Sequence, residues 1–160
     1  MDKIKLICVG KIKETYEKEA VFEYLKRLQP FADILVIEIK EEQIPKNPSH
    51  AEIEAALKAE AVKINKETEG YKKIALCIEG KSVSSIDFAS ILKENSNKGL
   101  KTAFIIGSAF GLCEEIKDNA DLKISLSKLT FTHRHARILL IEQIYRAYSI
   151  INNGKYHKEL

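Results

Sequence analysis

The stretch TAFIIG, residues 102–107, decides the fold class of this chain. It is an almost unbroken apolar run closed by a glycine, which is typical of a strand buried on both faces of a parallel sheet. On either side of it, strand-like runs and helical patterns alternate, so the sequence predicts an α/β fold with a mostly parallel sheet flanked by helices. Ser49 and Glu52 have the spacing of a capping box at the start of the second helix. Strands are expected at residues 4–9, 33–39, 72–80, 102–107 and 122–127, and helices at about 14–29, 49–70, 85–96, 112–118 and 135–153.

The composition is typical of one globular domain. The chain has 160 residues, of which 45% are hydrophobic and 31% charged, and no linker or repeat divides it. A single domain over residues 1–160 is therefore predicted. No apolar run approaches the roughly 20 residues of a membrane helix, and the N-terminal stretch is a poor secretion signal. Cys8, Cys77 and Cys113 are odd in number and lie in apolar sequence, so we expect a cytoplasmic protein with reduced cysteines and no metal.

The positive charge gathers near the C-terminal end. The chain carries a net charge of +3. Residues 122–160 hold seven Lys and Arg against Glu142 and Glu159, so this segment carries +5 and residues 1–121 carry −2. A basic end of this kind indicates an anionic partner such as RNA, a phosphate or a nucleotide. A solvated surface explains the charge equally well.

Two glycine-containing stretches are candidates for ligand binding. EGKS, residues 79–82, has the ending of a triphosphate-binding loop, but that motif needs a glycine where Ala75 stands inside a strand, so we reject it. IIGSAFGL, residues 105–112, follows the most buried strand, where ligands bind in open α/β sheets. Gly107 and Gly111 would allow close backbone approach or a positive φ. A ligand site and a simple tight turn are both compatible with this stretch.

Clustered charges lead directly into an apolar helix in TFTHRHARILLIEQIYRAY, residues 130–148. His133 and His135 alternate as metal ligands can, but no cysteine or carboxylate lies near them in the sequence. A structural or surface role is therefore favoured over zinc binding. The other interpretation is the polar rim of an active site, where imidazole and guanidinium groups orient or deprotonate a substrate.

The last helix has an apolar band wider than one sheet face covers. The residues of its two adjoining stripes are Leu140, Ile144, Ala147 and Ile151, and Ile141, Tyr145 and Tyr148. We interpret the band as packing both on the sheet and on a second subunit, as in a two-fold homodimer. The alternative is the central core helix of a monomer.

Five stretches carry a family resemblance: ICVGKIKE (7–14), LCIEGKSVSS (76–85), FIIGSAFGL (104–112), SLSKLTFTH (125–133) and ARILLIEQIYRAYSIINNGKYHKE (136–159). In order and spacing they resemble the RlmH family, small SPOUT-class methyltransferases of 23S ribosomal RNA. The likeness covers essentially the whole chain and is most specific in the C-terminal third. It implies a SPOUT fold with a C-terminal trefoil knot, a homodimer, S-adenosyl-L-methionine as methyl donor, and N3 of a pseudouridine as acceptor.

The resemblance also implies which residues form the site. The cofactor-binding positions are Leu76, Gly107, Leu126, Ser127, Lys128, Leu129, Thr130 and Phe131. The resemblance places residues 133–137 in a loop between the cofactor segment and the dimer helix, where His133 and Arg137 match catalytic positions that orient the substrate and stabilise charge. Tyr156 and His157 match catalytic positions of the tail, which in a dimer complete the partner's site; the alternative for them is a frayed terminus. No residue is singled out as the base that removes the N3 proton.

Three residues depart from the family's usual pattern. Ser108 stands where the family usually has a second glycine, which affects the turn after Gly107. Thr132 replaces a usual proline before His133, and Arg134 replaces a common glutamine, which affect the rigidity of that loop and a local substrate contact. A charge of +3 predicts modest, salt-sensitive affinity for isolated RNA, so the expected substrate is the assembled ribosome. Two rival interpretations stay open: a non-catalytic RNA- or ribosome-binding module with this fold, and a SPOUT methyltransferase with a different RNA substrate.

Overall fold

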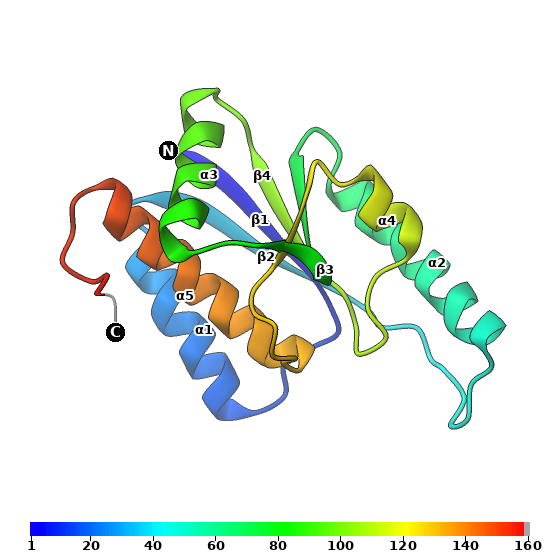
Figure 1. Cartoon of the computed structure of the whole chain (residues 1–160). Helices are drawn as coiled ribbons and strands as arrows, with labels where there is room; N and C mark the ends of the chain where they lie inside the picture. Colours follow the sequence, from blue (N-terminus) through cyan, green and yellow to red (C-terminus); the bar gives the residue numbers. More distant parts are fainter. Residues whose placement is uncertain (159–160) are drawn as a thin grey trace.

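Strands and helices alternate along residues 1–158, the part of the chain that the computed structural model describes (Figure 1). The elements in that range are β1 Asp2–Val9, α1 Thr15–Leu28, β2 Ala32–Ile39, α2 His50–Glu67, β3 Lys72–Ser82, α3 Ser85–Asn97, β4 Thr102–Ile106, α4 Glu114–Asn119, β5 Leu122–Ser125 and α5 His133–Ile151. Every predicted element is present, with bounds that differ by a few residues, so the predicted α/β fold is confirmed. Within the same range, no helix has the length and apolar character needed to cross a membrane.

The five strands form one parallel sheet in the order β2-β1-β4-β3-β5. β4 lies in the middle, and all of its residues are buried, as its apolar run predicts. Leu6 of β1, for example, pairs with Val36 of β2 on one side and with Phe104 of β4 on the other. Because the strands are parallel, their carboxyl ends meet at one edge of the sheet, which is where α/β proteins build their sites.

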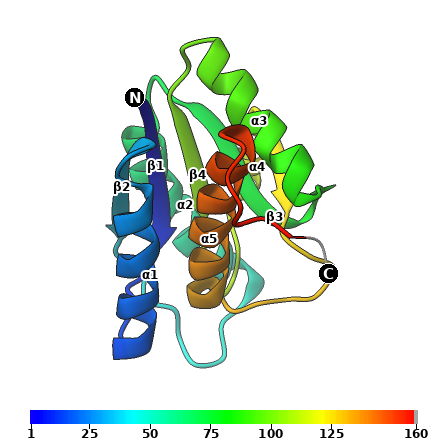
Figure 2. The same cartoon turned by 90° about the vertical axis from the view of Figure 1, so that its left-hand side faces the viewer.

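Helices cover both faces of the sheet (Figures 1 and 2). α1, α3 and α5 pack on one face, over a core that includes Leu28, Phe88 and Leu140. α2 and α4 pack on the other face, over a second core that includes Ile64 and Ile116. The result is a three-layer α/β arrangement.

β3 bulges where it passes β5. Ile124 of β5 pairs with Leu76 and again with Lys81, so residues 77–80 leave the ladder between these two points. Gly80 closes the bulge, since a Cβ on Gly80 would lie 2.5 Å from the carbonyl carbon of Ile124. The EGKS stretch is therefore sheet in close backbone contact with β5, in agreement with its rejection as a triphosphate loop.

α5 begins at His133, two residues earlier than predicted. Thr132 is its N-cap, and the Thr132 hydroxyl oxygen accepts a hydrogen bond from the His135 amide at 3.3 Å. The expectation that residues 133–137 form a loop is wrong, because these residues are the beginning of α5 and Thr132 caps them.

The apolar band of α5 is covered within one chain. Leu140, Ile141 and Ile144 are fully buried between the sheet and the neighbouring helices α1 and α3. The alternative interpretation, a central core helix, therefore explains most of the band, while Tyr145 and Ile151 stay half-buried. The homodimer stays a prediction that rests on the family resemblance, and so does the trefoil knot.

Candidate active site

A cavity of about 700 Å³ opens at the edge where β4 and β5 end, beside the bulge of β3. Its walls come from three segments, within residues 76–79, 106–112 and 125–136, together with Lys117 of α4. The positions implied for the cofactor that line it are Leu76, Gly107, Leu126, Ser127, Leu129, Thr130 and Phe131. Lys128 is not part of the lining. The fold thus brings distant cofactor positions around one space, and their contact with a cofactor stays a prediction.

The turn after β4 forms one wall of the cavity. The Gly111 amide donates to the Ser108 carbonyl oxygen at 2.9 Å, and Gly111 has a φ of +86°. A Cβ on Gly107 would lie 2.6 Å from the Gly111 carbonyl carbon, so only glycine fits there. Ser108 is accommodated at negative φ, and its hydroxyl oxygen accepts from the Phe110 amide at 3.3 Å. The stretch is therefore both a tight turn and a wall of a cavity.

A second wall, residues 125–131, is ordered by its own serines. The Ser125 hydroxyl donates to the Ser127 carbonyl oxygen at 2.9 Å, and the Leu129 amide donates to the Ser127 hydroxyl oxygen at 3.0 Å. Leu129 is 72% exposed, and Ile78 and Phe110 of the other walls are also exposed. Large apolar side chains therefore surround the mouth of the cavity.

The third wall, from β3, carries an ion pair and a thiol. Lys117 Nζ lies 2.7 Å from Glu79 Oε1, and this hydrogen bond lowers the pKa of Glu79, which is ionised at neutral pH. Burial raises the pKa of the Cys77 thiol, so Cys77 stays protonated and is a poor nucleophile. The wall is suited to binding and not to covalent catalysis.

His133 lines the cavity, and its contact with a substrate stays a prediction. Its ring lies against Gly10: a Cβ on Gly10 would be 3.5 Å from His133 Nε2 and 3.6 Å from Glu41 Oε2. Burial lowers the pKa of His133 below its usual 6.5; the Glu41 carboxylate opposes this shift, and the Arg134 and Arg137 cations reinforce it. The imidazole is therefore neutral at pH 7 and can accept a proton.

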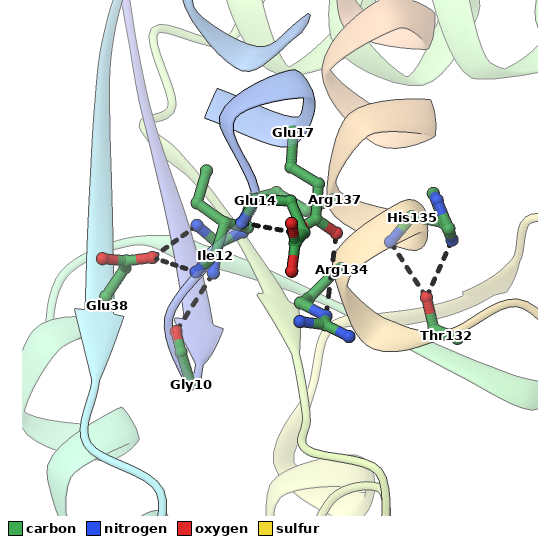
Figure 3. A network of polar contacts seen from close by, with 9 residues as sticks. All are labelled: Gly10, Ile12, Glu14, Glu17, Glu38, Thr132, Arg134, His135 and Arg137. Atoms are coloured by element: carbon green, nitrogen blue, oxygen red, sulfur yellow. Dashed lines mark hydrogen bonds and ion pairs between the residues drawn. The ribbon is translucent and has the colours of Figure 1, made fainter. Parts of the chain in front are cut away.

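Arg137 lies outside the cavity lining and is only 2% exposed. Its Nη1 donates to Glu38 Oε2 at 2.6 Å, and its Nη2 donates to the Gly10 carbonyl oxygen at 3.1 Å (Figure 3). Arg137 is therefore buried in the body of the protein, while His133 lies at the cavity. Sequence reasoning missed Glu38, although a carboxylate within the apolar strand DILVIEI was a usable signal.

The other side chains of the first turn of α5 also have partners (Figure 3). Arg134 lines the cavity, and its Nε lies 3.7 Å from Glu17 Oε2 of α1. His135 Nδ1 lies 3.0 Å from the Thr132 hydroxyl oxygen, and its ring stacks on Tyr16. In residues 1–158, no three His, Cys, Asp or Glu side chains are grouped so that they could hold a metal ion.

The tail residues Tyr156 and His157 lie on the middle of α5 in this chain. The Tyr156 hydroxyl donates to Glu142 Oε1 at 3.1 Å, and His157 Nδ1 lies 3.1 Å from Arg146 Nη1. Arg146 is thirteen positions after His133 in the sequence, which is about 20 Å along a helix axis. One chain therefore does not bring its own tail to the cavity.

Comparison with known proteins identifies the class. The family model described as "Predicted SPOUT methyltransferase" matches residues 2–157. A probable methylase family protein from Haemophilus influenzae Rd KW20 shares the fold with a TM-score of 0.59, over 99% of this chain and 71% of that chain, at 12% identity. A putative methylase family protein from Neisseria gonorrhoeae shares it with a TM-score of 0.55, over 99% of this chain and 87% of that chain, at 13% identity. The fold and the family match define a SPOUT methyltransferase.

Relatives of higher identity give the particular family. The chain is 45% identical to "Ribosomal RNA large subunit methyltransferase H" of Carboxydothermus hydrogenoformans, over 97% of this chain and 99% of that protein. It is 49% identical to the protein of the same name from Caldicellulosiruptor saccharolyticus, over 97% of this chain and 99% of that protein. The chain belongs to the ribosomal RNA large subunit methyltransferase H (RlmH) family, which confirms the resemblance carried by its motifs.

Proposed function

We propose that this chain transfers a methyl group from S-adenosyl-L-methionine to N3 of a pseudouridine in 23S ribosomal RNA. The family makes it a methyltransferase, and its relatives are named for the large-subunit RNA on which they act. The observation that carries the proposal is the cavity at the carboxyl ends of β4 and β5, beside the bulge of β3. Its lining includes His133 and every implied cofactor position except Lys128.

The cavity fits the donor in size and in chemistry. A volume of about 700 Å³ is within the roughly 300–1,000 Å³ of pockets that hold small molecules. Leu76, Leu126 and Leu129 offer apolar surface to an adenine ring. Bound S-adenosyl-L-methionine supplies an electrophilic methyl group on a cationic sulfur, which nearby carbonyl oxygens and carboxylates favour. Glu79 adds such a carboxylate and also neutralises Lys117 at 2.7 Å.

His133 is the residue proposed to meet the acceptor base. A uracil-type N3 keeps its proton at neutral pH and becomes a nucleophile when that proton leaves. Neutral His133 can accept a hydrogen bond or the proton at its unprotonated ring nitrogen. Methyl transfer is an in-line displacement, so the placement of N3 dominates the rate. His133 lies on the first turn of α5, directly after the segment that forms the second cavity wall.

We further propose that two copies of the chain share their sites, and that Tyr156 and His157 of one copy complete the cavity of the other. In one chain these residues are held about 20 Å along α5 from His133. A second copy would supply what the chain's own tail does not. The assembled ribosome is the proposed form of the substrate, because a net charge of +3 supports only modest affinity for free RNA.

The test is a methylation assay on 23S ribosomal RNA from a strain that lacks this activity, either stripped of protein or in assembled particles. Mass spectrometry should find one added methyl group on one pseudouridine, formed faster on the particles. Equal rates on naked RNA would contradict the ribosome proposal, and a methyl group on another nucleotide would contradict the acceptor. Calorimetry with S-adenosyl-L-methionine separates the enzyme from a non-catalytic binding module, which has no reason to bind the donor.

A further inference from the structure

One partly buried ion pair ties the first turns of α5 to the ends of β1 and β2 (Figure 3). Arg137 Nη1 lies 2.6 Å from Glu38 Oε2 of β2, and Nη2 donates to the carbonyl oxygen of Gly10 at 3.1 Å. The guanidinium is almost fully buried. A buried cation requires such partners, because its desolvation is costly without them. The two bonds run to different elements, so they fix the direction of the side chain.

Glu38 also holds the segment on which His133 rests. The same Oε2 atom accepts a hydrogen bond from the Ile12 amide at 3.2 Å. The Gly10 amide, at the start of this segment, donates to the Ile39 carbonyl oxygen at 2.8 Å. Gly10 has a φ of +100°, and the imidazole of His133 lies against it without an intervening side chain. The carboxylate therefore anchors both α5 and the backbone that supports the imidazole.

A second ion pair braces the same turn more loosely. Arg134 Nε lies 3.7 Å from Glu17 Oε2, beyond hydrogen-bonding distance, and the Arg134 side chain is 36% exposed. Glu17 is buried and already accepts from the Glu14 amide at 3.2 Å in the capping box of α1. Of the two ion pairs, Arg137–Glu38 therefore restrains the turn more strongly.

We propose that Glu38, acting through Arg137, is a positioning residue that holds the His133 imidazole in place for the acceptor base. The inference rests on the proposed function, in which His133 meets that base. Arg137 follows His133 by four positions, so both side chains project from the same face of α5. Holding Arg137 against Glu38 fixes the rotation of the turn and, with it, the direction of His133.

The same pair also sets the charge that His133 experiences. The charged groups that act on the imidazole are Glu41, from the segment after β2, Arg134 and Arg137, from α5, and Glu17, from α1. The two arginines lower the pKa of His133, and the two carboxylates raise it. Glu38 compensates the Arg137 cation from 2.6 Å. Loss of the carboxylate and loss of the cation should therefore move the pKa of His133 in opposite directions.

The test compares Glu38→Gln, Arg137→Gln and Arg137→Lys in the full-length protein. With donor saturating and assembled particles as substrate, we expect kcat to fall between about tenfold and 100-fold in Glu38→Gln and Arg137→Gln, because small displacements of a catalytic group cost that much. Arg137→Lys keeps the charge but loses the two-point contact. Compared with Arg137→Gln, it should return the pKa of His133 to the wild-type value but recover only part of kcat. Glu23→Gln is the control, because it breaks the exposed Glu23–Arg27 pair of α1 and should leave kcat within about twofold.

The pKa of His133 is read by NMR, with the signal assigned by its loss in His133→Asn. Glu38→Gln should lower this pKa and Arg137→Gln should raise it. Wild-type kcat in Glu38→Gln, or shifts of the same sign in both variants, would overturn the proposal. If Glu38→Gln does not fold, Glu38→Asp replaces it, because aspartate keeps the charge but shortens the side chain. An unchanged pKa of His133 with a reduced kcat would then support the proposal, and an unchanged kcat would contradict it. An inactive wild-type protein would refute the proposed function, while the titration would still test the positioning of His133.

Discussion

Replacing Gly107 by alanine tests whether the turn after β4 is a wall of the donor cavity. A Cβ there would lie 2.6 Å from the Gly111 carbonyl carbon and 3.0 Å from Leu112 Cδ2, so the turn has to move. Phe110 at its tip is 45% exposed, so the turn can relax outward in the free protein. A donor that requires the wild-type turn then binds against the overpacking strain, about 1–3 kcal/mol. We expect the Kd for S-adenosyl-L-methionine to rise roughly five- to 150-fold, since about 1.4 kcal/mol is a factor of ten.

Calorimetry gives the Kd, and a thermal melt of the same sample gives the stability. The matched control is Gly99→Ala, in the turn after α3, where a Cβ would meet no atom within 4 Å but φ is +67°. Alanine at that φ costs about 1 kcal/mol, which lowers Tm by roughly 2–4 °C for a chain of this size and should leave the Kd unchanged. The reasoning is refuted if Gly107→Ala binds the donor as the wild type does, or if Gly99→Ala loses donor affinity equally.

Three further changes have expected outcomes. Gly80→Ala would place its Cβ 2.5 Å from the backbone of Ile124, which is fully buried in β5 and has no room to relax. The free energy of unfolding should fall by about 2–3 kcal/mol, which lowers Tm by roughly 4–12 °C. An unchanged Tm would contradict the close approach. Thr132→Ala removes the N-cap of α5 and should cost about 1 kcal/mol in a urea titration, whereas Thr132→Ser should retain most of the stability. Burial lowers the pKa of His133 below 6.5, so the acidic limb of kcat/KM should lie below pH 6.5, and a limb above pH 6.5 would exclude His133 as its source. The stability that His133 contributes should be complete above pH 6.5 and be lost as pH falls through the folded-state pKa.

The order of the elements was predictable because the local signals agree with one another. The apolar run of β4 is buried throughout, and the spacing of Ser49 and Glu52 predicts the capping box that forms, with reciprocal bonds of 3.1 and 3.2 Å. The bulge of β3 was not predictable. It depends on Ile124 pairing with both Leu76 and Lys81, and such a pairing between distant segments leaves no periodic trace in either of them.

The site was predictable where chain connectivity alone determines it. Gly107 follows the most buried strand, so its position at the sheet edge and in the cavity follows from the parallel fold. The direction of Arg137 was not predictable. Its carboxylate partner, Glu38, is 99 positions earlier in the sequence, and no short motif connects them. Residues 133–137 were expected to form a loop at the active site, whereas they begin α5 and Arg137 is buried in the body of the protein.

These ion pairs also change how the basic end of the chain should be understood. Three of the seven cations in residues 122–160 are paired in the described structure: Arg134 with Glu17, Arg137 with Glu38 and Arg146 with Glu142. The four lysines of the segment form no ion pair within residues 1–158. For a single strand the slope of log K against log salt is about −0.7 per neutralised phosphate, so four lysines support a slope near −3, where all seven cations would give about −5. Arg137 in particular is buried against Glu38 and is withdrawn from RNA binding. The smaller number of unpaired cations supports a substrate whose other surfaces contribute the missing affinity.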